Sequence, residues 1–315
     1  MPYDFLTAWE PNAYLPIANE GVTQILLRGG KRVRPELLLC VARGLGERPG
    51  VSPEVREKEA LICARAAEWV HAATLSHDDV IDEASVRRGR PTLSAKLGNT
   101  KAVLTGDLLL SRVIRELSEL GNLEVLRSMS ETVESLVTGE WLQYDVRWKL
   151  EVDRKVLRTI AELKTGALIA WSAAAPARLR NAAPEVVGAL DAFGKNAGLA
   201  FQLVDDALDF SDRSGKDFGK DLKEGLINQA TLLIFELFPE FKEKLRGPFA
   251  RQSVVEADLL LPEWVMKRVE DTCRADSSAF LEEARSALFS IKKEFEPEAF
   301  TELLELLRKL ENRKV

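Results

Sequence analysis

The chain has 315 residues, of which 46% are hydrophobic and 30% charged, a composition that fits a folded globular protein and excludes a disordered one. Its 44 Lys and Arg residues against 50 Asp and Glu residues give a net charge of −6, with no basic block of the kind that follows a nucleic-acid backbone. No run approaches about 18 uncharged apolar residues. We therefore expect neither a nucleic-acid partner nor an integral membrane segment.

The cysteines and the N-terminal stretch indicate the compartment. Cys40, Cys63 and Cys273 lie far apart and form no CxxC pair, which excludes a disulfide framework and a thiolate zinc site. The first residues carry Asp4, Glu10 and several prolines instead of a basic stretch followed by an apolar run. We predict a cytoplasmic protein whose cysteines are small core residues.

Proline positions and apolar spacing predict the secondary structure. Proline breaks a helix interior, and the chain has two long proline-free intervals, 92–175 and 185–238. Within them apolar residues recur every three or four positions, and alternating strand patterns are absent. We expect helices over about 35–45, 53–83, 101–120, 123–148, 153–175, 184–210, 223–237, 262–289 and 297–312.

The predicted fold class is therefore all-α. Long helices with small residues on their apolar stretches, such as the alanines within 64–73, allow helix axes to approach closely in one large bundle. A single domain over 1–315 fits this pattern better than two domains. Segments 44–53 and 211–225 are predicted loops.

Two DDxxD triplets carry the clearest chemical signal. One consists of Asp78, Asp79 and Asp82, and the other of Asp205, Asp206 and Asp209. Spacings of three and four place each triplet on one face of its helix, among apolar neighbours. Carboxylates crowded in a partly buried cleft share protons or bind a cation, and Mg²⁺ prefers oxygen ligands completed by water and substrate phosphate. The alternative is a solvated helix end, which one copy alone would not exclude.

Basic residues that suit a phosphate ligand lie in three places. GGKRVRP at 29–35 combines a turn, three cations and a proline that opens a helix, although a solvated turn is the equal alternative. RRGRPT at 87–92 follows the first triplet closely enough to turn back toward an anion bound there. Lys164 lies in an otherwise apolar helix and needs a partner. His71 lies about 20° from Asp78 around the helix, whereas His77 points about 100° away and is predicted to be structural.

In order and spacing these motifs resemble the trans-isoprenyl diphosphate synthases, or polyprenyl synthetases. The matching segments cover about 29–225 and are GGKRVRP at 29–35, HAATLSHDDVIDEASVRRGRPT at 71–92, GNTKAVLTGDLLL at 98–110, GEWLQ at 139–143, KTGAL at 164–168 and FQLVDDALDF at 201–210. The resemblance implies a helical bundle around a central hydrophobic cavity, with both Asp motifs at its mouth, usually in a homodimer. It also implies a prenyltransferase that joins isopentenyl diphosphate to an allylic diphosphate, with about three Mg²⁺ ions per active site.

The resemblance also assigns roles by position. Asp78, Asp82 and Asp205 would bind Mg²⁺ directly, with Asp79, Asp206 and Asp209 as direct or water-mediated partners. Isopentenyl diphosphate would be held by Lys31, Arg34, His71 and Arg88. The allylic diphosphate would be held by Arg87, Lys164 and Lys216. Thr165 and Gln202 would lie beside the reacting carbons.

The sequence departs from the resembled enzymes at one position and also carries a signal for the length of the product. After Asp221 the resembled enzymes continue to a Gly-Lys pair, whereas this chain reads Gly225-Leu226, so one cation is missing and Lys220 or Lys223 is a candidate substitute. In the resembled enzymes the growing tail runs along the helix that carries the first Asp motif, and bulky residues before that motif stop its growth. Residues Ala67, Ala73 and Thr74 are small. The resemblance therefore implies six or more isoprene units, with Ala67, Val70, Ala73 and Thr74 as the chain-length residues. Trp69 lies about 180° from Asp78 and does not block this channel.

Other functions remain open. A cavity floor formed by Met129, Leu136 or Trp141 would give a farnesyl to geranylfarnesyl product instead. A class I terpene cyclase needs no isopentenyl diphosphate site, which GGKRVRP and His71 argue against. A non-catalytic subunit of a two-component synthase is expected to have lost one Asp motif, and this chain keeps both.

Overall fold

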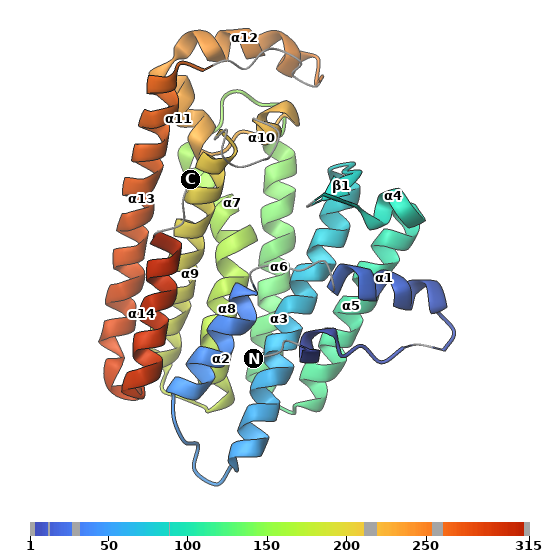
Figure 1. The fold of residues 1–315 in the computed structure, drawn as a ribbon, viewed down its shortest axis with the longest axis vertical. Coiled ribbons are helices and arrows are strands. Elements are labelled where there is room, and N and C mark those ends of the chain that lie inside the picture. Colours follow the sequence, from blue (N-terminus) through green and yellow to red (C-terminus); the bar gives the residue numbers. More distant parts are fainter. Residues whose placement is uncertain are drawn as a thin grey trace. The chain divides into compact units, whose positions relative to one another are not determined.

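The computed structural model describes residues 4–11, 13–26, 32–87, 89–210, 219–253 and 261–311, and these are almost entirely helical (Figure 1). The N-terminal elements are η1 (Asp4–Thr7), α1 (Pro16–Leu26), α2 (Val33–Gly44), α3 (Pro53–Ile81), the short strands β1 (Val86–Arg87) and β2 (Arg90–Pro91), α4 (Leu93–Leu97) and α5 (Asn99–Glu119). The later elements are α6 (Leu123–Val146), α7 (Arg154–Ala161), the π-helical turn η2 (Glu162–Gly166), α8 (Ala167–Leu179), α9 (Pro184–Leu208), α10 (Lys220–Lys223), α11 (Gln229–Leu237), α12 (Pro239–Ala250), α13 (Glu263–Ser290), η4 (Lys292–Glu294) and α14 (Pro297–Glu311). The predicted all-α class is confirmed.

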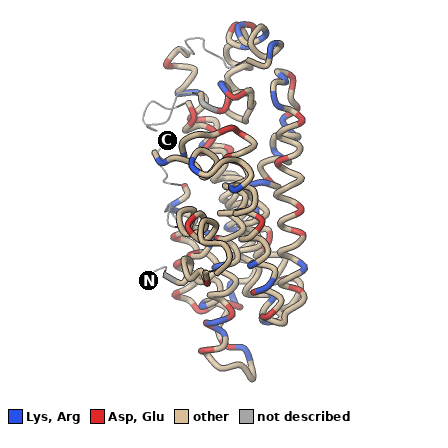
Figure 2. The backbone as a smooth tube through the Cα atoms, turned by 90° about the vertical axis from the view of Figure 1, so that its right-hand side faces the viewer, with Lys and Arg blue, Asp and Glu red and all other residues tan. Residues whose placement is uncertain are grey.

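The chain divides into two compact units. Unit 1 comprises Met1–Ser130, Ser172–Val187 and Glu294–Ala299, and unit 2 comprises Glu131–Trp171, Gly188–Lys293 and Phe300–Val315. Basic and acidic residues are interspersed along the helices (Figure 2). Among the helices described, none is both long and apolar enough to cross a membrane. The single domain over 1–315 stays a prediction.

Helix α3 is the central element of unit 1. It begins at the cap residue Ser52, whose Oγ accepts a hydrogen bond from Val55 N at 3.4 Å, and Pro53 occupies its first turn. Its alanine-rich stretch is fully buried, and the helix packs against α2 and α5. His77 extends from α3 to α5, where its Nε2 lies 3.1 Å from Val103 O. This contact agrees with the structural role predicted for His77.

The core of unit 2 forms where α9, α11, α12 and α13 pack together. Aromatic side chains fill it, including Phe210, Phe235, Phe241 and Phe249, each less than 8% exposed. Cys273 belongs to the same cluster, and Cys40 and Cys63 are buried in unit 1, all three as free thiols. The cysteines are therefore core residues, as predicted.

The structure differs from the predicted elements at several boundaries. Segments 16–26 and 239–250 are helical although neither was predicted, and Pro176 and Pro248 lie inside α8 and α12. A proline costs a helix about 3 kcal/mol, and in α8 the complete burial of Ala174, Ala175 and Ala177 offsets that cost. The helix predicted from 223 begins at Gln229, because Asn228 caps it with its side-chain oxygen at 2.9 Å from Thr231 N.

Glycines allow α9 to approach α8 and the π-helical turn. A Cβ atom added at Gly194 would lie 2.6 Å from Ala170 Cα and 2.7 Å from Ile169 O, and one at Gly198 would lie 2.8 Å from Gly166 Cα. These are backbone atoms, which cannot move aside as a flexible side chain can. The helix pair is therefore packed too closely for any side chain at these positions.

This packing predicts opposite effects for two alanine substitutions on α9. Gly194→Ala should lower the free energy of unfolding by about 1–3 kcal/mol, because the new methyl group overlaps the backbone of α8. Gly188→Ala is the matched control: nothing lies within 4 Å of its Cβ position, so it should be neutral or stabilising by about 0.5–1 kcal/mol. Urea unfolding measures both, and equal stabilities would contradict the close packing.

Candidate active site

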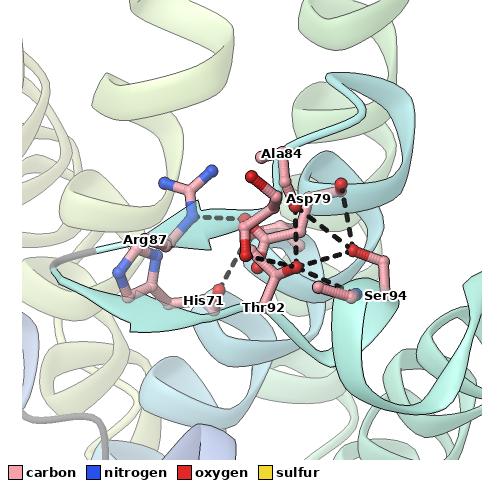
Figure 3. A network of polar contacts seen from close by, with 9 residues as sticks. His71, Asp79, Ala84, Arg87, Thr92 and Ser94 are labelled. Atoms are coloured by element: carbon pink, nitrogen blue, oxygen red, sulfur yellow. Dashed lines mark hydrogen bonds and ion pairs between the residues drawn. The ribbon is translucent and has the colours of Figure 1, made fainter. Parts of the chain in front are cut away.

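The first Asp triplet lies at the C-terminal end of α3. Asp78 and Asp79 belong to its last turn, and Asp82 is the residue that caps it, with its N–H donating to Asp78 O at 2.8 Å. Asp78 and Asp82 are half-buried, whereas Asp79 is fully buried and its Oδ1 accepts a hydrogen bond from Arg87 Nε at 2.5 Å (Figure 3). The two half-buried carboxylates are thus partly accessible, whereas the buried one holds the Arg87 guanidinium.

The hairpin after α3 brings Arg87 back to the triplet. Ala84 N donates to Asp79 O at 3.0 Å, and Thr92 Oγ1 donates to Ala84 O at 2.7 Å. Thr92 also caps α4 by accepting from Ala95 N at 3.1 Å, and Ser94 joins the same polar network (Figure 3). The chain therefore turns back on itself within five residues, as the spacing between the triplet and RRGRPT predicts.

The predicted isopentenyl diphosphate residues are only partly described. His71 lies on α3 two turns before Asp78 and is half-buried, and Arg34 is half-buried in the first turn of α2. Lys31 and Arg88 lie outside the described residues, as does Lys216 of the predicted allylic site.

Sequence reasoning counted Arg32 among the cations of GGKRVRP but missed its pairing with Glu68. The Arg32 guanidinium pairs with the buried Glu68 carboxylate and donates from Nη2 to Leu26 O at 2.6 Å, so it fixes the start of α2 on α3. Arg32 also adopts a left-handed backbone conformation with φ 48°. The available signal was Glu68, an acidic residue among the buried alanines of α3 that requires a cationic partner.

The second Asp triplet lies at the end of α9 in unit 2. Asp205 is half-buried, whereas Asp206 and Asp209 are each 6% exposed. Asp206 accepts hydrogen bonds from Gln202 Nε2 at 2.8 Å and from Gln229 N at 3.2 Å. Burial raises the pKa of Asp206 to about 7, with Asp221 and Asp205 adding repulsion and the two hydrogen bonds opposing the shift.

Gln202 connects this triplet to the π-helical turn. Thr165 Oγ1 donates to Gln202 Oε1 at 2.7 Å, so the amide is oriented with its nitrogen toward Asp206. A π-helical turn is rare and often occurs at functional sites, and here it presents Thr165 to α9. Gln202 lies four residues before Asp206, so one turn of α9 brings the amide and the carboxylate to the same helix face.

Lys164 has the partner that its apolar surroundings predict. Its Nζ pairs with the Glu140 carboxylate on α6, and both side chains are mostly buried. Gly139 allows this contact, because a Cβ there would lie 2.8 Å from Lys164 Cγ and 3.1 Å from Lys164 N. The pair holds the ammonium group in place beside Thr165.

A turn over residues 219–229 supports the second triplet through hydrogen bonds that sequence reasoning did not predict. Asp221 N donates to Asp209 Oδ2 at 3.2 Å, and Asn228 Nδ2 donates to Asp221 Oδ2 at 3.1 Å. Gln229 N, at the start of α11, bonds Asp206. The signal that was available is the Asn-x-x-Thr pattern from Asn228 to Thr231, which is typical of a helix cap.

The predicted chain-length residues differ in their burial. Ala67, Val70 and Ala73 are fully buried in unit 1, whereas Thr74 is half-buried and donates from Oγ1 to His71 O at 3.0 Å. Trp69 packs edge-on against Trp9 with ring centroids 5.6 Å apart, and its Nε1 donates to Leu6 O at 2.9 Å. Trp69 thus contacts the N-terminal segment of unit 1. Of the alternative floor residues, Met129 and Leu136 are buried, and Trp141 is 70% exposed.

The carboxylates suit a hard divalent cation whose coordination shell is completed by water and a bound phosphate. Across the described ranges, no three His, Cys, Asp or Glu side chains gather closely enough to hold a metal ion by themselves. The triplets offer carboxylate oxygens, which Mg²⁺ prefers, and Mg²⁺ usually takes one or two carboxylates with water and substrate phosphate. The residues therefore fit ions that bind together with a diphosphate.

Comparison with known proteins identifies relatives over most of the chain. Residues 16–259 match the model of the polyprenyl synthetase family. A prenyl transferase of Synechocystis sp. is 36% identical over 79% of this chain and 76% of that protein. The chloroplastic solanesyl diphosphate synthase 1 of Arabidopsis thaliana is 34% identical over 76% of this chain, and the match spans only 60% of the plant protein's length.

Solved structures share the fold along nearly the whole chain. A decaprenyl diphosphate synthase from Rhodobacter capsulatus superposes with a TM-score of 0.85 at 26% identity, covering 98% of this chain and 94% of that one. A polyprenyl synthase from Caulobacter crescentus, complexed with calcium and isoprenyl diphosphate, gives a TM-score of 0.81 at 28% identity, covering 98% and 92%.

The raised pKa of Asp206 predicts a pH-dependent stability in the metal-free protein. Between its ordinary value of 3.8 and about 7, the folded state holds a proton that the unfolded state releases, so the free energy of unfolding should fall as pH rises through this window. The free energy of unfolding of Asp206→Asn should depend less on pH than that of the wild type. Relative to the wild type, the variant should gain stability between low pH and pH 8, since each pKa unit is worth about 1.4 kcal/mol.

Urea unfolding in EDTA at several pH values measures this effect. Asp271→Asn, at an exposed position on α13, is the control and should follow the wild type. If the free energies of unfolding of Asp206→Asn and the wild type changed with pH in the same way, the raised pKa of Asp206 would be contradicted.

Proposed function

The chain belongs to the polyprenyl synthetase family, and on that basis we propose that it joins isopentenyl diphosphate head to tail with an allylic diphosphate. The product is an all-trans polyprenyl diphosphate of six or more isoprene units, in keeping with long-chain relatives such as the plant solanesyl and bacterial decaprenyl synthases. The observation that carries the proposal is the pair of complete Asp triplets, each with a hydrogen-bonded support of its own. The whole of 1–315 acts as one synthase domain in this proposal.

Mg²⁺ ions, about three per active site, are the proposed cofactor. Half-buried Asp78, Asp82 and Asp205 are the direct ligands, and Asp79, Asp206 and Asp209 act beside them or through water. The calcium and isoprenyl diphosphate bound by the Caulobacter relative support a divalent cation with a diphosphate. The ions supply positive charge that stabilises the diphosphate as it leaves.

The remaining residues hold and orient the substrates. Arg87, fixed by Asp79, and Lys164, fixed by Glu140, meet the allylic diphosphate, and Lys216 belongs to the same proposed group. Thr165 and Gln202 lie beside the reacting carbons, where their mutual hydrogen bond fixes the amide dipole. The residues proposed to hold isopentenyl diphosphate are Lys31, Arg34, His71 and Arg88.

The reaction proceeds by ionisation and alkene attack. The allylic C–O bond breaks with its electron pair going to the diphosphate, and the alkene of isopentenyl diphosphate forms the new C–C bond. The resulting cation loses a proton, which the released diphosphate accepts. Arg87 and Lys164 bear positive charge next to the leaving group, so they stabilise it most when its charge is fully developed.

Assembly and location belong to the same proposal. We propose a homodimer, as the resemblance implies. The three buried free thiols suit a reducing compartment such as the cytoplasm.

The first test is product formation. The purified chain, incubated with Mg²⁺, labelled isopentenyl diphosphate and allylic primers from dimethylallyl to geranylgeranyl diphosphate, should give products of six or more units. Asp205→Asn should lower kcat by at least about 10²-fold by removing an Mg²⁺ ligand, whereas exposed Asp271→Asn should not. No incorporation with any primer would leave the non-catalytic subunit as the better reading, and ionisation without incorporation would favour a cyclase.

Product length provides a second prediction. Thr74→Phe should shorten the product by several units, because a ring at this half-buried position, one turn before Asp78, blocks the channel for the tail. Ile62 lies on the same helix and lines a groove together with Trp9 and Trp69. Ile62→Phe is therefore the control, and it should leave the product length unchanged. Chromatography of the dephosphorylated products measures both. An unchanged product from Thr74→Phe would place the chain-length limit elsewhere and revive the shorter-product alternative.

A further inference from the structure

The 219–229 turn is fastened to the second Asp triplet at both of its ends. At one end Gly219 N donates to Asp209 O at 2.8 Å and Asp221 N donates to Asp209 Oδ2. At the other, Gln229 N donates to Asp206 Oδ2. Between them Leu226 N returns to Asp221 O at 2.8 Å, so position 226 stays next to Asp221. The turn is therefore fixed against the triplet at both ends.

Arg147, directly after α6, is held against the turn. Its Nε donates to Glu224 O at 2.8 Å, and Glu224 is itself one turn from Asp221, with Glu224 N donating to Asp221 O at 3.1 Å. The guanidinium lies 5.8 Å from the centre of the Trp148 ring, a cation–π distance. Two independent contacts thus fix the direction of this side chain.

The backbone next to Arg147 is strained at Trp148. Trp148 has φ +62°, a left-handed conformation that is unusual for a bulky residue, and its N–H donates to Gly225 O at 2.8 Å. Gly225 has φ +79°, and a Cβ there would lie 2.3 Å from the Trp148 ring. Such strain costs on the order of 1–3 kcal/mol and occurs mostly where function requires it.

The turn places Asp221 next to the triplet, because the Asp221 N–H donates to Asp209 Oδ2 at 3.2 Å. Leu226 occupies the place where the resembled enzymes carry a lysine. In the parts of the chain that the structure describes, Glu224 O is the one acceptor that the Arg147 guanidinium bonds, so its two terminal nitrogens are available to another anion.

We propose that Arg147 binds the allylic diphosphate and supplies the positive charge that Leu226 does not. The inference rests on the proposed function, because it needs a diphosphate at the second triplet. Arg147 suits this role better than Lys223, whose side chain makes no hydrogen bond or ion pair within the described ranges and would have to be ordered on binding. A guanidinium fixed through Nε presents its terminal nitrogens as a fork, which matches phosphate oxygens.

The test compares four variants with the wild type. Arg147→Gln should raise the KM for the allylic diphosphate by about 10-fold to 100-fold, the effect of losing a hydrogen bond between charged groups, and leave the KM for isopentenyl diphosphate within about twofold. Lys223→Gln, the matched control on the same turn, should change neither. Leu226→Lys alone should have little effect, and Arg147→Gln combined with Leu226→Lys should regain most of the lost affinity.

Rescue separates binding from mere support of the turn. Leu226→Lys restores a cation but not the hydrogen bond to Glu224 O, so a structural role for Arg147 would not be rescued by it. A second readout avoids turnover: calorimetry with Mg²⁺ and an unreactive allylic thiolodiphosphate should show the same order of affinities.

Four results would overturn the inference. If Arg147→Gln binds the thiolodiphosphate as tightly as the wild type, or raises both KM values without rescue by Leu226→Lys, Arg147 does not bind the allylic diphosphate. If Lys223→Gln alone reproduces the loss, Lys223 is the compensating cation. A wild-type chain that binds no thiolodiphosphate with Mg²⁺ overturns the proposed function itself, and this inference with it.

Discussion

The site depends on crowding carboxylates at the ends of two helices, α3 and α9. At the end of α9, burial holds the pKa of Asp206 at about 7 even though Gln202 and the Gln229 backbone both donate to it. At the end of α3 the fully buried Asp79 is satisfied by Arg87, while Asp78 and Asp82 are half-buried. A cation bound with an anionic ligand is the simplest chemistry that uses carboxylates crowded in this way.

Close helix packing is what positions the supporting groups. Gly194 and Gly198 bring α9 against α8 and the π-helical turn, and that approach places Thr165 within 2.7 Å of Gln202. Gly139 leaves room for Lys164, which pairs with Glu140. Gly225 leaves room for the Trp148 ring, which lies next to Arg147. In each pair a polar contact next to an Asp triplet or its neighbours depends on a backbone position where a side chain would collide. The fold and the site are therefore specified by the same few small residues.

The sequence predicts local features of this site well, and distant pairings poorly. Helical periodicity places each triplet on one face, and a four-residue spacing places Gln202 beside Asp206, because a single helix has known geometry. The pairing of Arg32 with Glu68, of Lys164 with Glu140 and of Arg147 with Glu224 depends on which helices pack together, which periodicity does not contain. Proline as a helix boundary was wrong at Pro176 and Pro248, because tertiary packing outweighs the local cost. Lys31, Arg88 and Lys216 lie outside the described residues.

The central claim is that the carboxylate triplets hold a diphosphate through Mg²⁺, and calorimetry with inorganic pyrophosphate tests it most directly. The account predicts that Mg²⁺ alone binds weakly, since no three metal-binding side chains gather anywhere in the described parts of the chain. Pyrophosphate with Mg²⁺ should bind at least about tenfold more tightly than pyrophosphate in EDTA, and Asp82→Asn and Asp205→Asn should each weaken that binding. Pyrophosphate binding that is indifferent to Mg²⁺, or unchanged in both variants, would contradict the account.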